Sequence, residues 1–271
     1  MVDRPVDGPL ERPPLLAGAR GVVIGVSSER SIGYACAATA RALGAEVAIT
    51  YRPTRVRDGA RLAEQLGASL HAPLEAGDDA TIDEAFAALE QAFGRLDFVV
   101  HTLMHVPSEL LERPLTELSA DDFARVLDVG VHSLLRLCRH ARPLLMRSKA
   151  PRVVTISSPC SQRATPHYHV AGIAKAALES ALVYLAQELG PAGILCNAVS
   201  PALLATDGAL AVVGADAAAA TRAHLGKRAA TRRPIELDDV ADCVAWLCSP
   251  MARQVTGEVI TIDGGYSRSY F

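Results

Sequence analysis

The stretch GVVIGVSSERSIGYACA, residues 21–37, gives the strongest indication of the fold. An apolar run ends in Gly25, a short polar turn follows, and Ser31 precedes residues with helical spacing. A glycine at the end of a strand lets backbone amides approach a phosphate, and the start of a helix adds partial positive charge. Ser31 is placed to cap that helix and to contact a pyrophosphate. The stretch therefore predicts a strand–turn–helix unit suited to a dinucleotide.

Apolar runs and helical patterns alternate along the rest of the chain. The expected strands cover residues 21–25, 46–50, 69–73, 97–101, 152–157, 194–199 and 258–262. The helical patterns begin near Ser31, Val56, Ile82, Ala120, Pro166, Asp207 and Leu237. Continuous Val/Ile runs suit strands that are covered on both faces, and the alternation implies right-handed crossovers. The sequence predicts an α/β fold: a single-domain, doubly wound (Rossmann) parallel sheet of about seven strands with helices on both faces.

Two segments stand apart from this alternation. Residues 1–18 are rich in proline, and we expect a short flexible leader ahead of a single domain over residues 19–271. Residues 203–231 are rich in alanine and irregular, and they follow the sixth expected strand. Ligands of doubly wound sheets bind outside the carboxyl ends of the strands, so we interpret 203–231 as a lid. A plain surface helical hairpin is the alternative.

Composition bears on the class of partner. The chain has 271 residues and a net charge of −3, which gives no support for binding to nucleic acid or to a membrane surface. We find no apolar run approaching the roughly 20 residues of a membrane span. The six cysteines form no Cys-x-x-Cys pair, which indicates reduced thiols in a cytoplasmic protein. The eight histidines show no spacing typical of metal ligands, so no metal is expected.

The end of the second expected strand bears on the coenzyme. A free adenosine ribose favours an acidic side chain at this point, whereas a 2′-phosphate favours arginine. No acidic residue ends this strand, and Arg52, Arg55 and Arg57 crowd the following turn. The pattern favours NADPH, with NADH as the alternative; a solvated basic helix start would also explain it.

The stretch PHYHVAGIAKAA, residues 166–177, carries the candidate chemistry. Tyr168 and Lys175 are about two turns of a ~3.6-residue helix apart and would share one face. A lysine beside a tyrosine favours the phenolate and lowers the pKa of the phenol, which would make Tyr168 a proton donor or oxyanion partner near neutral pH. The stretch follows a strand that ends in Ser157 and Ser158. This context favours catalysis over an ordinary amphipathic helix.

From Gly21 to Gly265 the chain resembles the short-chain dehydrogenase/reductase superfamily, and within it the enoyl-acyl-carrier-protein reductases. The motifs that carry the resemblance are Gly25-x5-Ser31-Ile32, Phe98-Val-Val-His101-Thr102, Tyr168-x6-Lys175, Asn197-Ala-Val-Ser200 and Gly257-Glu-Val-Ile-Thr-Ile-Asp263-Gly-Gly. The resemblance implies NAD(P)H-dependent reduction of the C=C bond of an α,β-unsaturated acyl thioester, of fatty acid or polyketide type. It also implies a carrier protein or coenzyme A on the substrate, and a cytoplasmic homotetramer.

The resemblance further implies roles for individual residues. The catalytic group would be Tyr168 and Lys175, with Ser158 beside them. Met104, Val106, Ser158 and Tyr168 would contact the substrate. The coenzyme would be bound by Gly25, Ser31, Ile32, Arg52, Glu75, Ala76, Leu103, Lys175, Leu204 and Thr206.

Three departures from the usual patterns bear on the reaction, and two of them keep alternatives open. Ser158 stands where well-known enoyl reductases have a second tyrosine, and ketone reductases of the superfamily place their catalytic serine there. A 3-ketoacyl or other carbonyl reductase is therefore the main rival. Gly130 stands where the wider superfamily has a relay asparagine; enoyl reductases also lack that asparagine, which favours enoyl reduction. Met104 replaces a glycine and adds bulk beside the nicotinamide, which leaves a catalytically silent NADP-binding sensor as a third reading.

Overall fold

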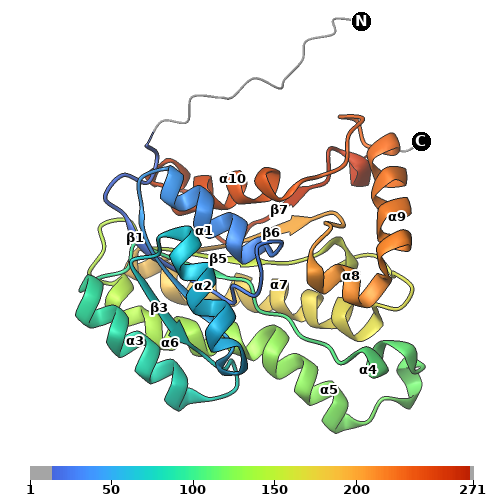
Figure 1. Ribbon diagram of the computed structural model, residues 1–271, viewed down its shortest axis with the longest axis horizontal. Helices are drawn as coiled ribbons and strands as arrows, with labels where there is room; N and C mark the ends of the chain where they lie inside the picture. The colour runs from blue at the N-terminus through green and yellow to red at the C-terminus, as the bar shows by residue number, and fades with distance from the viewer. Residues whose placement is uncertain (1–13, 269–271) are drawn as a thin grey trace, which may run out of the picture.

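The computed structural model describes residues 14–268 and confirms the predicted alternation of strands and helices (Figure 1). Each expected strand matches an observed one to within two residues at either end. The strands are β1 (Arg20–Ile24), β2 (Glu46–Tyr51), β3 (Leu70–Pro73), β4 (Phe98–His101), β5 (Arg152–Ile156), β6 (Leu195–Pro201) and β7 (Val259–Ile262). In β1, β2, β4 and β5, runs rich in β-branched residues are buried on both faces, which explains why these segments form strands, whereas the edge strands β3 and β7 are partly exposed.

All seven strands pair in parallel, in the order β3-β2-β1-β4-β5-β6-β7. The direction of winding reverses between β1 and β4. In an open sheet of this kind, the crevice at the carboxyl ends of the strands beside the reversal is where a ligand binds. The fold therefore places the functional site at the ends of β1 and β4.

Helices cover both faces of the sheet (Figure 1). One core lies between the sheet and α1, α2 and α10, and the second lies between the sheet and α3, α6 and α7. In Figure 1, α4, α8 and α9 gather at one end of the molecule. The helices are α1 (Ile32–Ala42), α2 (Val56–Leu66), α3 (Asp79–Phe93), α4 (Ser108–Glu112), α5 (Ala120–Leu127), α6 (Ser133–Leu145), α7 (His169–Leu189), α8 (Asp207–Val213), α9 (Ala215–Arg228) and α10 (Leu237–Cys248).

Several helix boundaries differ from the expectation. Helix α3 begins earlier than Ile82, because the Asp78 side chain accepts a hydrogen bond from the Ala80 N–H and caps it there. The pattern from Ala120 does not form one helix: a π-helical segment, Asp128–His132, separates α5 from α6. The short helix α4 was not expected.

The amino-terminal boundary also needs correction. Of the expected leader 1–18, residues 1–13 lie outside the described residues. Leu16 is only 2% exposed within the first core, and its N–H donates to the Leu43 carbonyl at 2.9 Å. The packed domain therefore begins before residue 19.

Among residues 14–268, one helix has the length and mean hydropathy of a membrane span, which corrects the expectation that no such run exists. It covers His169–Ala192, and half of its most apolar window is buried inside the fold. Its buried residues, such as Leu178 and Leu182, belong to the second core beneath the sheet. This is the burial expected of a core helix.

Candidate active site

The crevice at the switch point is built around Gly25, which ends β1 with a φ of 97°. A Cβ atom added there would lie 2.6 Å from the Cδ2 atom of Leu103, which follows β4. Only glycine combines this backbone conformation with such close packing. Two of the predicted coenzyme residues, Gly25 and Leu103, therefore meet where the winding reverses.

The turn after Gly25 is fixed by Ser31. Its Oγ atom accepts a hydrogen bond from the Tyr34 N–H at 3.2 Å and donates one to the Ser28 carbonyl at 2.7 Å. Ser31 thus caps α1, and Ile32 is the first residue of that helix. Free amides at a helix start next to a glycine without a side chain suit a pyrophosphate. This local geometry fits a dinucleotide.

The loop after β6 closes the same side of the crevice. Leu204 is 4% exposed in the first core, and the Thr206 Oγ1 atom caps α8 by accepting from the Ala209 N–H at 3.1 Å. Arg30 reaches across from the first turn and donates to the Ala205 carbonyl at 3.0 Å. The two loops expected to contact the pyrophosphate are therefore joined directly.

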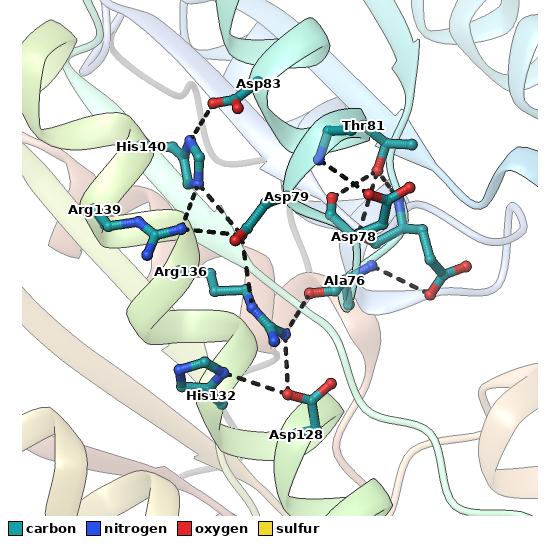
Figure 2. Close-up of polar contacts among 12 residues, drawn as sticks. Ala76, Asp78, Asp79, Thr81, Asp83, Asp128, His132, Arg136, Arg139 and His140 are labelled. Atoms are coloured by element: carbon teal, nitrogen blue, oxygen red, sulfur yellow. Dashed lines mark hydrogen bonds and ion pairs between the residues drawn. The ribbon is translucent and has the colours of Figure 1, made fainter.

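The predicted adenosine-binding residues follow β2 and β3. Arg52 is exposed, and Ala76 is 5% exposed. The Ala76 carbonyl accepts a hydrogen bond from Arg136 Nη1 at 3.2 Å, and the same nitrogen lies 3.0 Å from Asp128 Oδ1 (Figure 2). Glu75 accepts from the neighbouring Ala76 N–H at 3.2 Å. Sequence reasoning missed Arg136, because a contact across 60 residues leaves no local pattern.

Tyr168 lies at the entrance to α7 and not within the helix, as its N-cap residue. The preceding His167 has a φ of 57°, an uncommon left-handed conformation that turns the chain into the helix. Tyr168 packs against a buried apolar cluster that contains Val170 and Ala174, and the same cluster contacts Met104, Val106 and Val212. Val212 belongs to α8, so the segment expected to form a lid contributes to the same apolar surface. Three of the four predicted substrate residues, Met104, Val106 and Tyr168, thus pack against one cluster, and Ser158 is not part of it.

Met104 and Gly130 are complementary in shape. A Cβ atom on Gly130 would lie 3.1 Å from the Met104 Sδ atom and 3.2 Å from the Ala174 Cβ atom. The absence of a side chain at Gly130, inside the π-helical segment, makes room for the larger residue. Part of the bulk of Met104 is therefore accommodated between helices.

Lys175 is 5% exposed and donates from Nζ to the Ile156 carbonyl at 2.7 Å. Burial lowers its pKa to about 8, and the negative charge of Glu179 acts in the opposite direction. Burial also raises the pKa of Tyr168 to about 12, with a further contribution from Cys160. The expectation that Lys175 lowers the Tyr168 pKa is wrong here, because burial of the phenol dominates. Tyr168 is consequently a neutral hydrogen-bond donor at neutral pH.

Ser158 has a local structural partner. Its Oγ atom accepts from the Cys160 N–H at 3.3 Å and so caps a single turn, Pro159–Ser161. On either side of it, the hydroxyls of Ser157 and Ser161 both donate to Glu179 Oε1, the latter at 2.7 Å. Glu179 follows Lys175 by one helical turn, and this spacing could have indicated it. The carboxylate holds the loop that carries Ser158 against α7.

A buried histidine lies beneath the site. His101 is fully buried; its Nδ1 atom is 2.8 Å from Thr155 Oγ1, and its Nε2 atom is 2.9 Å from Ser133 Oγ. Ser133 donates its own proton to the Val129 carbonyl at 2.6 Å, so it accepts from the Nε2–H of His101. Burial, with a smaller contribution from Lys175, lowers the pKa of His101 to about 3. His101 is therefore neutral.

This network predicts a pH-dependent stability. Because the native histidine stays neutral, the unfolded chain alone binds a proton as the pH falls below 6.5, the ordinary value. The contribution of His101 to the free energy of unfolding is complete above pH 6.5 and is lost as the pH falls toward 3. By about pH 5 this loss amounts to about 2 kcal/mol. Urea unfolding at pH 7 and pH 5 should show this extra loss in the native chain but not in His101→Gln. Equal losses in both proteins would contradict the assignment.

Comparisons with known proteins agree with this geometry. The family described as enoyl-(acyl carrier protein) reductase matches residues 25–267. Enoyl-(acyl-carrier-protein) reductase (NADH) FabI of Aquifex aeolicus is 35% identical over 253 residues, which is 93% of this chain and 92% of that protein.

Solved structures show the same fold. The reductase of Anaplasma phagocytophilum in complex with NAD has a TM-score of 0.86 and 31% identity, with 95% of each chain covered. The Bacillus cereus enoyl-acyl carrier protein reductase with NADP+ and an indole naphthyridinone has a TM-score of 0.89 and 30% identity, covering 95% of this chain and 99% of that one. This chain is a member of the enoyl-acyl-carrier-protein reductase family, within the short-chain dehydrogenase/reductase fold.

Proposed function

We propose that the protein reduces the C=C bond of a 2-enoyl thioester carried on an acyl carrier protein, in the synthesis of fatty acids or related chains. The observation that carries the proposal is Tyr168, a half-buried and protonated phenol that packs against the apolar cluster containing Val170 and Ala174, as do Met104, Val106 and Val212. Such a surface suits an acyl chain, and the phenol suits the thioester oxygen beside it. The names of the family and of the relatives support this substrate.

The bound coenzyme, Tyr168 and Lys175 have different roles in this reaction. The bound coenzyme supplies the hydride that reaches the β-carbon of the enoyl group. Tyr168 donates a hydrogen bond to the thioester oxygen, where negative charge develops as the enolate forms. A positioned donor of this kind lowers the activation free energy by roughly 3–4 kcal/mol. Lys175, held at the Ile156 carbonyl, would hold the ribose of the bound coenzyme with its remaining N–H groups and would add positive charge to the site.

Carbonyl reduction is the second candidate, because Ser158 stands where a ketone reductase has its catalytic serine. The hydrogen bond from the Cys160 N–H gives the Ser158 hydroxyl oxygen a capping role, which supports the enoyl reaction instead. We expect rapid oxidation of the reduced coenzyme with a 2-enoyl thioester and slow oxidation with the matching 3-ketoacyl thioester. Coenzyme absorbance measures both rates, and an equal or faster rate with the ketone would favour the rival.

We propose NADH as the coenzyme and NADPH as a weaker alternative, which reverses the order that the arginines suggested. The relatives' names support NADH, although the Bacillus cereus structure contains NADP+. Arg55 Nη1 lies 3.7 Å from Asp58 Oδ2, so part of the positive charge after β2 is already compensated. Arg52, exposed at the end of β2, is the residue best placed to meet a 2′-phosphate.

Replacing Arg52 with alanine should separate the two coenzymes. A charge-assisted hydrogen bond contributes about 1.5–3 kcal/mol, so KM for NADPH should rise on the order of tenfold or more. KM for NADH should change little, because NADH has no 2′-phosphate. Steady-state kinetics with both coenzymes make the comparison, and Arg57→Ala is the matched control. An equal loss for both coenzymes would show that Arg52 does not select the phosphate.

Further proposals concern a lid, the oligomeric state, the carrier protein and the location of the protein in the cell. We propose that residues 203–231 act as a lid, supported by Val212, which packs against the same apolar cluster as Tyr168.

A homotetramer is supported by apolar side chains left exposed on α7, with Val183 55% exposed and Tyr184 76% exposed. Exposed Lys227 and Arg228 at the end of α9 suit an acidic carrier protein. The six unpaired thiols support a cytoplasmic location.

A further inference from the structure

A second cavity lies at the amino-terminal edge of the sheet, opposite to the active site. Its volume is about 590 Å³, and it is lined by residues at the starts of β5 and β6 and after α10. Three of the lining residues are cationic, namely Lys149, Arg152 and Arg253, and none is acidic. Since β5 has five residues, each rising about 3.3 Å, this edge is roughly 15 Å from the carboxyl ends of the strands.

Arg152 is the unusual member of this group. It begins β5 on the face that Val154 and Ile156 bury in the first core, and it is itself only 3% exposed. Its Nη1 atom donates to the Pro151 carbonyl at 3.0 Å, whereas its Nε atom has no hydrogen-bond partner among residues 14–268. A strand position that would ordinarily hold an apolar residue thus holds a cation.

The charge of Arg152 lacks a protein counterion within the described part of the chain. Arg113 and Arg222 also have an unpartnered Nε atom, but their guanidinium groups pair with Asp122 and Glu236. No carboxylate of residues 14–268 forms such a pair with Arg152. Burial lowers the pKa of Arg152, which reflects the cost of an uncompensated buried charge. An anion from solution would remove that cost.

We propose that this cavity binds a phosphorylated small molecule, with Arg152 at its base and the exposed Lys149 and Arg253 at its rim. Guanidinium groups match the oxygen geometry of phosphate, and three cations without an acid suit a ligand with two or more negative charges. A volume of about 590 Å³ lies within the range of small-molecule sites and exceeds the need of a single inorganic ion. The site is separate from the coenzyme crevice and leaves it free.

Calorimetric titration of pyrophosphate into the full-length protein tests the proposal. The protein is first saturated with NADH, so that the pyrophosphate site of the coenzyme is filled, and ionic strength is kept constant with chloride. We expect saturable binding with one site per chain, tighter than that of inorganic phosphate. Arg152→Met should raise the Kd about tenfold or more, as expected for loss of a charge-assisted contact. Arg147→Ala removes a nearby arginine that pairs with Glu90 outside the cavity, and it should leave the Kd unchanged.

Thermal unfolding and a rim variant provide two further tests of this site. Pyrophosphate should raise the Tm of the native protein and not that of Arg152→Met, whose Tm without anion should equal or exceed the native value because a buried charge is gone. If Arg152→Met does not fold, the rim variant carrying Lys149→Ala and Arg253→Ala decides, and it should lose pyrophosphate binding. The proposal is overturned if the NADH-saturated protein binds no pyrophosphate. It is equally overturned if the rim variant binds pyrophosphate as tightly as the native protein.

Discussion

Replacing Tyr168 with phenylalanine is expected to lower kcat for a 2-enoyl thioester by about 10²–10³-fold, the usual effect of losing one oxyanion donor. The aromatic ring stays packed on the apolar cluster that contains Val170 and Ala174, so the fold and the binding of the coenzyme should change little. The lost hydroxyl acts on charge that develops only in the transition state, which places the loss in kcat. Single-turnover oxidation of the coenzyme at saturating substrate measures it.

Ser158→Ala is the matched control for Tyr168→Phe, since it also removes one hydroxyl beside the same site. The Ser158 oxygen caps the turn Pro159–Ser161, so we expect most of the turnover to remain. A loss as large as that of Tyr168→Phe would make the serine part of the core chemistry. The roles assigned to both residues would then be wrong.

Replacing Lys175 with methionine should weaken the binding of NADH and lower kcat together, each by at least about tenfold. Methionine keeps an unbranched apolar chain in the buried site and removes only the ammonium group, so collapse of the core is not the expected cause. One cation serves both the ribose and the field around Tyr168, and its loss therefore acts on two steps. Calorimetry gives the affinity for NADH, and single-turnover kinetics give the rate.

The pH dependence of the native enzyme provides a second test of Lys175. Burial lowers the pKa of Lys175 from 10.5 to about 8 in the coenzyme-free protein, so the ammonium is fully charged only below that value. Affinity for NADH should therefore fall as the pH rises through about 8. In Lys175→Met this fall should be absent. A decline of the same size in the variant would assign it to another group.

The fold could be predicted because short, mainly apolar runs, several of them rich in β-branched residues, alternate with helical patterns along the whole chain. Short or irregular elements could not. Helix α4, Ser108–Glu112, is too short to show a period, and the π-helical segment Asp128–His132 differs from an ordinary helix only in its hydrogen bonding. The leader boundary was misplaced because the apolar pair Leu15 and Leu16, which packs on the core, is too short to show a repeating pattern.

The candidate site was predictable where a residue follows a strand, since parallel strands carry such residues to one edge of the sheet. Gly25 and Ser158 were identified in this way, whereas Leu103 was named only from the family resemblance. The pKa of Tyr168 was not predictable, because it depends on burial by segments distant in sequence. Arg136 was missed for the same reason: its contact with Ala76 exists only once α6 packs beside the loop after β3.

The most direct test of the function follows the transferred hydrogen. The native enzyme is given NADH carrying deuterium at both C4 positions of the nicotinamide, with equal amounts of a 2-enoyl and a 3-ketoacyl thioester in one reaction. We predict a saturated acyl thioester with one deuterium on its β-carbon, identified by mass spectrometry and NMR. Deuterium found chiefly on the carbinol carbon of a 3-hydroxyacyl thioester would contradict enoyl reduction and establish the enzyme as a ketone reductase.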